Sequence, residues 1–322
     1  MPVTKYIAPW FYIINRTFMQ TAENWLEYCA GEMKRAGLFF GHGTGNEHDE
    51  AAWMLLHVLE APLDGSFTQW DVVLNAEQRR ALRKLLARRI NERCPLAYLT
   101  GKARFCGLDF VVTPDVLVPR SPLAELIVQQ FSPWLNPSGE GRVLDMCTGG
   151  ACIAIAMAVH MPGYSVDAVD ISPAALSVAA QNTKLHGVQD RVSLIQSDLF
   201  DQLGHTSYDL IVSNPPYVAA DVWADLPPEY KAEPSAGLVS GEDGLDIVLK
   251  ILDASPTFMK QQGILVVEVG ESAGALLDEL PRVPFLWLDF ERGGDGIFLL
   301  EYEQLIACRA DIRTALEKRK HV

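Results

Sequence analysis

The 322-residue sequence lacks any apolar run of about eighteen residues, the length at which a membrane-spanning helix is expected. Its first residues also lack a basic segment followed by an apolar one, which is the pattern of a secretory signal. These two absences predict a cytoplasmic protein without a membrane partner.

Paired cysteines are absent as well. The six cysteines are scattered and form no Cys-x-x-Cys pair: they are Cys29, Cys94, Cys106, Cys147, Cys152 and Cys308. Neither a disulfide framework nor a zinc site is therefore expected, and this usage fits a reducing compartment. His42 and His48 lack partner ligands at useful spacing, so no metal is predicted.

Basic residues are scarce in only one part of the chain. Residues 1–95 contain 11 Lys and Arg against 11 Asp and Glu, whereas residues 96–322 contain 16 against 30. The whole formal charge of −14 therefore lies after residue 95. An acidic surface repels bare nucleic acid and favours a basic partner.

Residues from about Thr17 to Arg93 are predicted to be helical. Apolar residues recur at helical spacing between Trp25 and Ala36, and Gly37 then ends the helix. Asp49 is the expected N-cap of a second helix that runs to Leu59.

A third helix, from about Ala76 to Arg93, has a narrow apolar stripe at Leu82, Leu85, Leu86 and Ile90. Basic residues cover its other faces: Arg79, Arg80, Arg83, Lys84, Arg88, Arg89 and Arg93. Residues 79–93 are either a solvated helix face or a surface that contacts RNA, because clustered Arg and Lys suit phosphates.

After Pro95 the pattern changes. Residues 96–120 resemble a β-hairpin linker with Gly107 in its turn, and Ser121-Pro122 opens the next helix. Strands then alternate with helices, which predicts an α/β domain with a parallel sheet covered on both faces. The expected strands span 143–146, 166–170, 192–196, 210–213, 264–269, 285–290 and 296–302. Because residues 292–295 join the last two directly, these should form an antiparallel hairpin at one end of the sheet.

The first strand turns into a helix through Asp145-x-Cys147-x-Gly149-x-Ala151. This is not the Gly-x-Gly-x-x-Gly of dinucleotide binders, and a carboxylate at its start suits an ammonium group. Asp170 ends the second strand, where it can accept hydrogen bonds from ribose hydroxyls. Asp198 and Leu199 follow the third strand, where they could hold an adenine. The order of these residues along the first three strands favours S-adenosylmethionine over NAD as the cofactor.

The fourth strand ends in Asn214-Pro215-Pro216-Tyr217. Prolines donate no backbone N–H and fix φ, so this turn is stiff and presents hydrogen-bond acceptors. One amide side chain, a row of carbonyls and an aromatic face can together hold a planar N–H₂ group beside an electrophile.

These motifs together resemble the class I S-adenosylmethionine-dependent methyltransferases, and more narrowly the N5-glutamine methyltransferases of proteins. The matching segments are Phe105–Phe110, Val118–Arg120, Asp145–Gly149, Asn214–Tyr217 and Gly241–Asp246. The sequence Arg120-Ser121-Pro122 and the loop Phe40–Thr44 are similar to the branch that acts on large-subunit ribosomal protein L3. One departure is Ala151, where the family commonly has its third glycine, and this could weaken cofactor binding.

The resemblance implies a Rossmann-like, seven-stranded, mostly parallel sheet, with S-adenosylmethionine as methyl donor, S-adenosylhomocysteine as product and no metal. It divides the chain into a helical substrate-recognition domain (1–95), a hairpin linker (96–120), the methyltransferase domain (121–303) and a helical tail (304–322). Residues 218–237 should form a lid, and Ser240 and Asp243 a capping box for the next helix.

Roles for individual residues also follow from the resemblance. The catalytic residues would be Asn214, Pro215 and Tyr217. The cofactor would contact Asp145, Cys147, Thr148, Gly149, Gly150, Ala151, Asp170, Ile171, Asp198, Leu199 and Asn214. The substrate would contact Asn214, Pro215, Pro216, Tyr217, Arg120 and Phe105.

Three alternatives stay open at this point. Peptide chain release factors are the substrates of the other glutamine branch, and N6-adenine methyltransferases hold an exocyclic amine with a similar motif. A ribosome-assembly factor that binds the cofactor without using it is the third. Within the preferred branch, the substrate could be free L3 or an assembling ribosomal particle.

Overall fold

The computed structural model describes residues 20–291 and 293–319. Over these residues the chain forms two compact units that divide between Thr100 and Gly101. No helix in the described ranges is both long and apolar enough to cross a membrane. Thr17, the expected start of the first helix, and Arg292 of the terminal hairpin lie outside the described residues.

The first unit is helical, as predicted. It contains α2 (Ala22–Arg35), α3 (Glu47–Val58), α4 (Ala76–Glu92) and the short α5 (Leu96–Thr100). Thr21 caps α2 by accepting a hydrogen bond from the Asn24 amide at 3.3 Å. The predicted cap of α3 was wrong: Asn46 is the N-cap, because its side chain accepts from the amides of both His48 and Asp49.

The placement of Arg89 among the basic residues on the outer faces of α4 was also wrong. Arg89 is 1 % exposed, and its Nε lies 2.5 Å from Oε1 of Glu50, which is also buried. Arg89 follows Leu82 by seven residues and therefore returns to the buried side of the helix. Arg83 lies over the ring of Trp25, 5.0 Å from its centroid.

The second unit begins with an antiparallel hairpin of β1 (Lys102–Phe105) and β2 (Leu108–Val111). Its main sheet has the strand order β5-β4-β3-β6-β7-β9-β8. The ranges are β3 (Gly141–Met146), β4 (Tyr164–Asp170), β5 (Val192–Gln196), β6 (Tyr208–Ser213), β7 (Met259–Glu268), β8 (Leu286–Trp287) and β9 (Ile297–Glu301). The first five strands in this order pair parallel, and β9 pairs antiparallel with both β7 and β8. This confirms the seven-stranded sheet with an antiparallel end.

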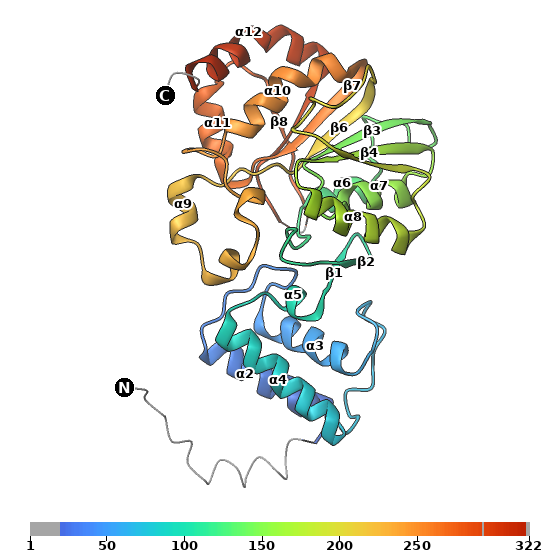
Figure 1. Ribbon diagram of the computed structural model, residues 1–322, viewed down its shortest axis with the longest axis vertical. Helices are drawn as coiled ribbons and strands as arrows, with labels where there is room; N and C mark the ends of the chain where they lie inside the picture. Colours follow the sequence, from blue (N-terminus) through green and yellow to red (C-terminus); the bar gives the residue numbers. More distant parts are fainter. Residues whose placement is uncertain (1–19, 292, 320–322) are drawn as a thin grey trace. The chain divides into compact units, whose positions relative to one another are not determined.

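Helices cover both faces of this sheet (Figure 1). One apolar core joins the sheet to α6 (Leu123–Val128), α7 (Cys152–His160) and α8 (Pro173–His186). A second core joins the opposite face to α10 (Asp246–Phe258), α11 (Ala273–Glu279) and α12 (Tyr302–Lys318). In such doubly wound sheets a ligand crevice forms at the carboxyl ends of the strands, where the strand order reverses. Here the order reverses at β3, between β4 and β6.

The segment between β6 and α10 folds into α9 (Ala220–Asp225) and the 3₁₀ turns η1 (Pro228–Ala232) and η2 (Ser235–Gly237). A β-bridge between Val218 and Val239 closes its base. The predicted capping box after it was wrong. Helix α10 begins only at Asp246, where the Ser240 hydroxyl accepts from the Ile247 amide, and Asp243 instead forms an ion pair with Arg319.

Candidate active site

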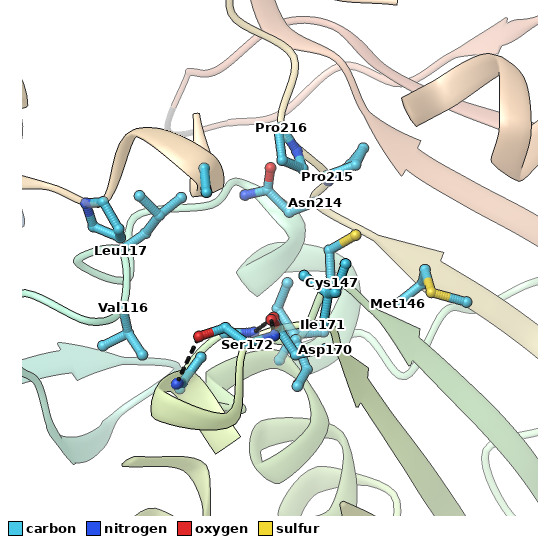
Figure 2. A pocket seen from close by; sticks show the side chains of 18 of the residues that line it. Val116, Leu117, Met146, Cys147, Asp170, Ile171, Ser172, Asn214, Pro215 and Pro216 are labelled. Atoms are coloured by element: carbon cyan, nitrogen blue, oxygen red, sulfur yellow. Dashed lines mark hydrogen bonds between the residues drawn. The ribbon is translucent and has the colours of Figure 1, made fainter. Parts of the chain in front are cut away.

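A cavity of about 250 Å³ lies at the carboxyl ends of β3, β4 and β6. In Figure 2, Asn214, Pro215 and Pro216 lie on one side of it, with Asp170 and Ile171 opposite. Most of the predicted site residues line this cavity: Cys147, Thr148, Gly149, Gly150, Asp170, Ile171, Asp198, Leu199, Asn214, Pro215, Pro216, Tyr217 and Arg120. The fold thus brings together side chains that lie up to about a hundred positions apart in sequence.

The turn after β3 presents its backbone to the cavity. Gly149 has φ +55°, a backbone conformation that glycine adopts more readily than residues with a side chain. Its amide donates to Asp170 Oδ2 at 2.8 Å. Ala151 also has a left-handed backbone, with φ +60°, at a strain of about 1–2 kcal/mol. It is fully buried at the start of α7 and does not line the cavity. The alanine side chain therefore acts on the shape of the turn and is not part of the cavity wall.

Asp145 lies behind this turn and does not line the cavity. It is fully buried, and its Oδ2 accepts from the Thr148 hydroxyl at 2.5 Å and the Ala154 amide at 3.0 Å. Burial raises the pKa of this carboxyl to about 7, although both hydrogen bonds oppose the shift. The position of Asp145 supports a role in holding the turn and argues against direct contact with an ammonium group.

Asp170 joins the turn to the next strand. Its Oδ1 accepts from the Ser172 amide and its Oδ2 from the Gly149 amide, both at 2.8 Å. Burial raises the pKa of this carboxyl, and these amides counteract part of the rise. A carboxylate has about four acceptor positions, so two remain for a ligand that offers hydroxyl groups. Next to it, Ile171 is 61 % exposed and offers an apolar surface at the edge of the cavity.

The Asn214–Tyr217 turn is held firmly at its aromatic end. The Tyr217 hydroxyl donates to Glu268 Oε1 at 3.0 Å, and the Tyr217 carbonyl accepts from the Ser272 hydroxyl at 2.6 Å. A Cβ at Gly270 would lie only 2.7 Å from Cε2 of the Tyr217 ring. Glycine at this position is what allows the ring to lie where it does. Burial raises the pKa of Tyr217, so its phenol keeps its proton at neutral pH.

Arg120 lines the cavity, but its guanidinium is already engaged. Its Nη1 and Nη2 lie 2.6 Å and 2.7 Å from the two carboxylate oxygens of Glu233. The same carboxylate accepts from the Val118 amide at 2.9 Å, and the Tyr230 ring lies under the guanidinium. Burial alone would lower the pKa of Arg120, but Glu233 reverses this and raises it. Arg120 is therefore part of the wall and has few donors left for a substrate.

Phe105, the other predicted substrate residue, does not line the cavity. It is 5 % exposed and packs in the core that contains α7, with Phe110 at a centroid distance of 6.5 Å. Because side chains alternate along a strand, Arg104 next to it points outward and Phe105 inward.

Two acidic residues of the site were missed by the sequence analysis. Glu268 and Glu233 are both buried; Glu268 lines the cavity, and Glu233 is the partner of Arg120. Glu268 carried a signal, because it is a charge that directly follows the apolar strand run Ile264–Val267 at the ligand-binding edge. Glu233 carried none, since it stands in a segment rich in Pro, Ala and Glu. Among the described residues no group of three or more His, Cys, Asp or Glu could hold a metal ion.

Comparison with known proteins matches two family models to this chain. Residues 34–101 match the PrmC N-terminal domain, and residues 124–225 match the methyltransferase small domain. A solved structure, the hMettl16 catalytic domain in complex with MAT2A 3′UTR hairpin 6, is 16 % identical with a TM-score of 0.50. It covers 77 % of this chain and 92 % of its own, and it supports the fold alone. Fold and family model together define the second unit as a class I methyltransferase.

Two relatives narrow the class further. The ribosomal protein uL3 glutamine methyltransferase of Xanthomonas campestris pv. campestris is 48 % identical, over 91 % of this chain and 95 % of its own length. The ribosomal protein uL3 glutamine methyltransferase of Xylella fastidiosa strain 9a5c is 45 % identical, over 90 % of this chain and 92 % of its own length. The chain belongs to the ribosomal protein uL3 glutamine methyltransferase family.

Proposed function

We propose that this protein transfers a methyl group from S-adenosylmethionine to the side-chain amide nitrogen (N5) of a glutamine in ribosomal protein uL3. The observation that carries the proposal is the cavity itself, in which the Asn214–Pro216 turn lies opposite Asp170 (Figure 2). The names of the relatives support the choice of uL3. We place the reaction in the cytoplasm, together with its ribosomal substrate.

The residues around the cavity fit S-adenosylmethionine, which supplies a methyl group already activated by a sulfonium. Asp170 has free acceptor positions for the ribose hydroxyls, and Ile171 and Leu199 offer apolar walls for the adenine, with Asp198 as a polar partner. The positive φ at Gly149 lets the backbone approach a ligand closely. After methyl transfer, S-adenosylhomocysteine would leave this site as the product.

The glutamine amide needs acceptors rather than a base, because its nitrogen lone pair is delocalised into the carbonyl. Asn214 Oδ1 and the Pro215 carbonyl would each accept one N–H of the substrate amide. The face of Tyr217 would pack against the planar amide and favour a nearby positive charge. Positioning of this kind lowers the activation free energy of a reaction between two bound groups by up to about 7–11 kcal/mol.

A substrate panel tests the proposal directly. Purified protein is incubated with radiolabelled S-adenosylmethionine and either uL3, a release factor, ribosomal RNA or duplex DNA. We expect label on uL3 alone, and mass spectrometry should place one methyl group on a glutamine. Label on nucleic acid or on the release factor in preference to uL3 would overturn the choice of substrate.

Asp170→Ala is expected to weaken S-adenosylmethionine binding by about 30-fold or more, because a carboxylate that can accept two hydroxyl hydrogen bonds is removed. Isothermal titration calorimetry measures the affinity. Asp190→Ala, which removes an exposed carboxylate elsewhere in the same unit, should leave it unchanged. Equal affinities in all three proteins would exclude Asp170 from the cofactor site.

We further propose that an assembling particle is a better substrate than free uL3, with α4 approaching ribosomal RNA. Arg80, Arg83, Lys84 and Arg88 are exposed on this helix. Charge reversal at Arg80 and Lys84 is expected to slow methylation of particles at least about fivefold while leaving that of free uL3 unchanged, since phosphate contacts act only on the particle. Reversal of the exposed Lys184 and Lys250 is the matched control. Equal effects on both substrates would refute the RNA contact.

A further inference from the structure

Glu268 is a buried carboxylate beside the Asn214 turn. It ends β7 and is 5 % exposed, and it lines the cavity. Strands β6 and β7 pair in register, with Ser213 opposite Val267, so Asn214 and Glu268 leave the sheet as neighbours. A buried carboxylate is costly unless hydrogen bonds compensate for its lost hydration. The partners of Glu268 therefore indicate what it holds in place.

Those partners come from two other segments, residues 120–121 and the Asn214–Tyr217 turn. The Ser121 hydroxyl donates to Oε2 at 2.5 Å, and the Tyr217 hydroxyl donates to Oε1 at 3.0 Å. Burial raises the pKa of Glu268. Hydrogen bonds from Ser121 and Tyr217, the polar side chain of Asn214 and the charge of Arg120 all oppose that rise. The Ser121 and Tyr217 hydroxyls thus act as donors to the carboxylate, and Arg120 adds a positive charge.

This arrangement determines which atom of Asn214 can serve a substrate. An ionised carboxylate only accepts hydrogen bonds, and the only donor of an asparagine side chain is its Nδ2. Asn214 leaves β6 beside Glu268, so a hydrogen bond between the two side chains would have to use Nδ2. That orientation leaves Oδ1 as the acceptor for a substrate. In the same way, the phenol proton of Tyr217 is committed to Glu268, which fixes the ring.

We propose that Glu268 is a positioning residue for methyl transfer: it sets the amide orientation of Asn214 and the ring of Tyr217 before the substrate binds. This inference rests on the proposed function, in which both residues contact the glutamine amide. Glu268 itself acts through them and accepts no proton from the substrate.

The test compares Glu268→Ala with Glu268→Gln in steady-state methylation of uL3. Glu268→Ala is expected to lower kcat about 30- to 100-fold, with the KM for S-adenosylmethionine within about threefold, because preorganisation is lost while the cofactor residues remain. Glu268→Gln keeps an acceptor for the Tyr217 hydroxyl and should recover at least about fivefold of that loss. The exposed Glu271 provides the control, and Glu271→Ala should match the wild type.

Tyr217→Phe is the milder second variant, which keeps the ring and removes only its tether to Glu268. It should lower kcat about tenfold. Combined with Glu268→Ala, it should add less than about threefold, since both changes break the same contact.

Several results would overturn the inference. These are an unchanged kcat in Glu268→Ala, equal losses in the Ala and Gln variants, or fully additive effects with Tyr217→Phe. If Glu268→Ala fails to fold, an unchanged kcat in Tyr217→Phe overturns it instead. Absence of methyl transfer by the wild-type protein would overturn the proposed function as well, whereas an active wild type with an equally active Glu268→Ala overturns this inference alone.

Discussion

Asn214→Ala is expected to lower methyl transfer to glutamine by about a thousandfold, because it removes one of two acceptors that orient the amide nitrogen toward the methyl donor. Asp170, which we assign to the cofactor, lies on the opposite side of the cavity (Figure 2) and keeps its hydrogen bond from the Gly149 amide. Affinity for S-adenosylmethionine should therefore stay within about tenfold of the wild type. Single-turnover assays with labelled donor measure the first quantity, and calorimetry measures the second.

Asn214→Asp separates the roles of the two side-chain atoms. An aspartate keeps an acceptor of the same shape, but it lacks the Nδ2 that we assign to Glu268 and places a second carboxylate beside that residue. We expect it to be as inactive as Asn214→Ala. Wild-type turnover in Asn214→Ala would contradict the mechanism, and a fully active Asn214→Asp would contradict the orientation that we assign to the amide.

The sheet could be predicted from the sequence because its signals are local. Apolar runs such as Val143–Met146 and Leu210–Ser213 are bounded by polar or turn residues, and their alternation with helices requires a parallel sheet. The antiparallel end followed from the short connection before β9. Residues at or just after the ends of these strands, such as Asp170 and Asn214, were accordingly assigned to the ligand-binding edge, and both line the cavity.

The structure departs from the predicted positions where the outcome depends on which side of the backbone a residue faces. Asp145 and Phe105 stand in the right motifs, but their side chains point into the interior behind the cavity wall. Arg89 was placed with the basic residues opposite the apolar stripe, whereas it is buried against Glu50, which lies 39 positions earlier on another helix. Glu233 lies 113 positions from Arg120, and the local sequence around either residue does not predict the other as its partner. Ion pairs between residues this far apart in sequence are determined by tertiary packing.

The Arg120–Glu233 pair leads to the second large expected effect. The Glu233 side chain is fully buried, and that of Arg120 is 25 % exposed. Arg120→Met keeps much of the apolar stem but leaves the carboxylate without its cation. Breaking a buried pair in this way typically costs about 3–5 kcal/mol, so we expect a drop of that size in the free energy of unfolding measured with urea. Arg282→Met, which breaks an exposed pair with Asp311, should cost less than about 1 kcal/mol.

A second substitution shows whether the uncompensated charge is the cause. Glu233→Gln added to Arg120→Met removes that charge and keeps an acceptor for the Val118 amide, so it should restore most of the lost stability. If Arg120→Met releases only residues 227–238 from the cavity wall, hydrogen exchange at Val118 will accelerate more than exchange in β6. A loss in Arg120→Met no larger than in Arg282→Met would mean that Glu233 finds water or another donor, and that this wall does not depend on the pair.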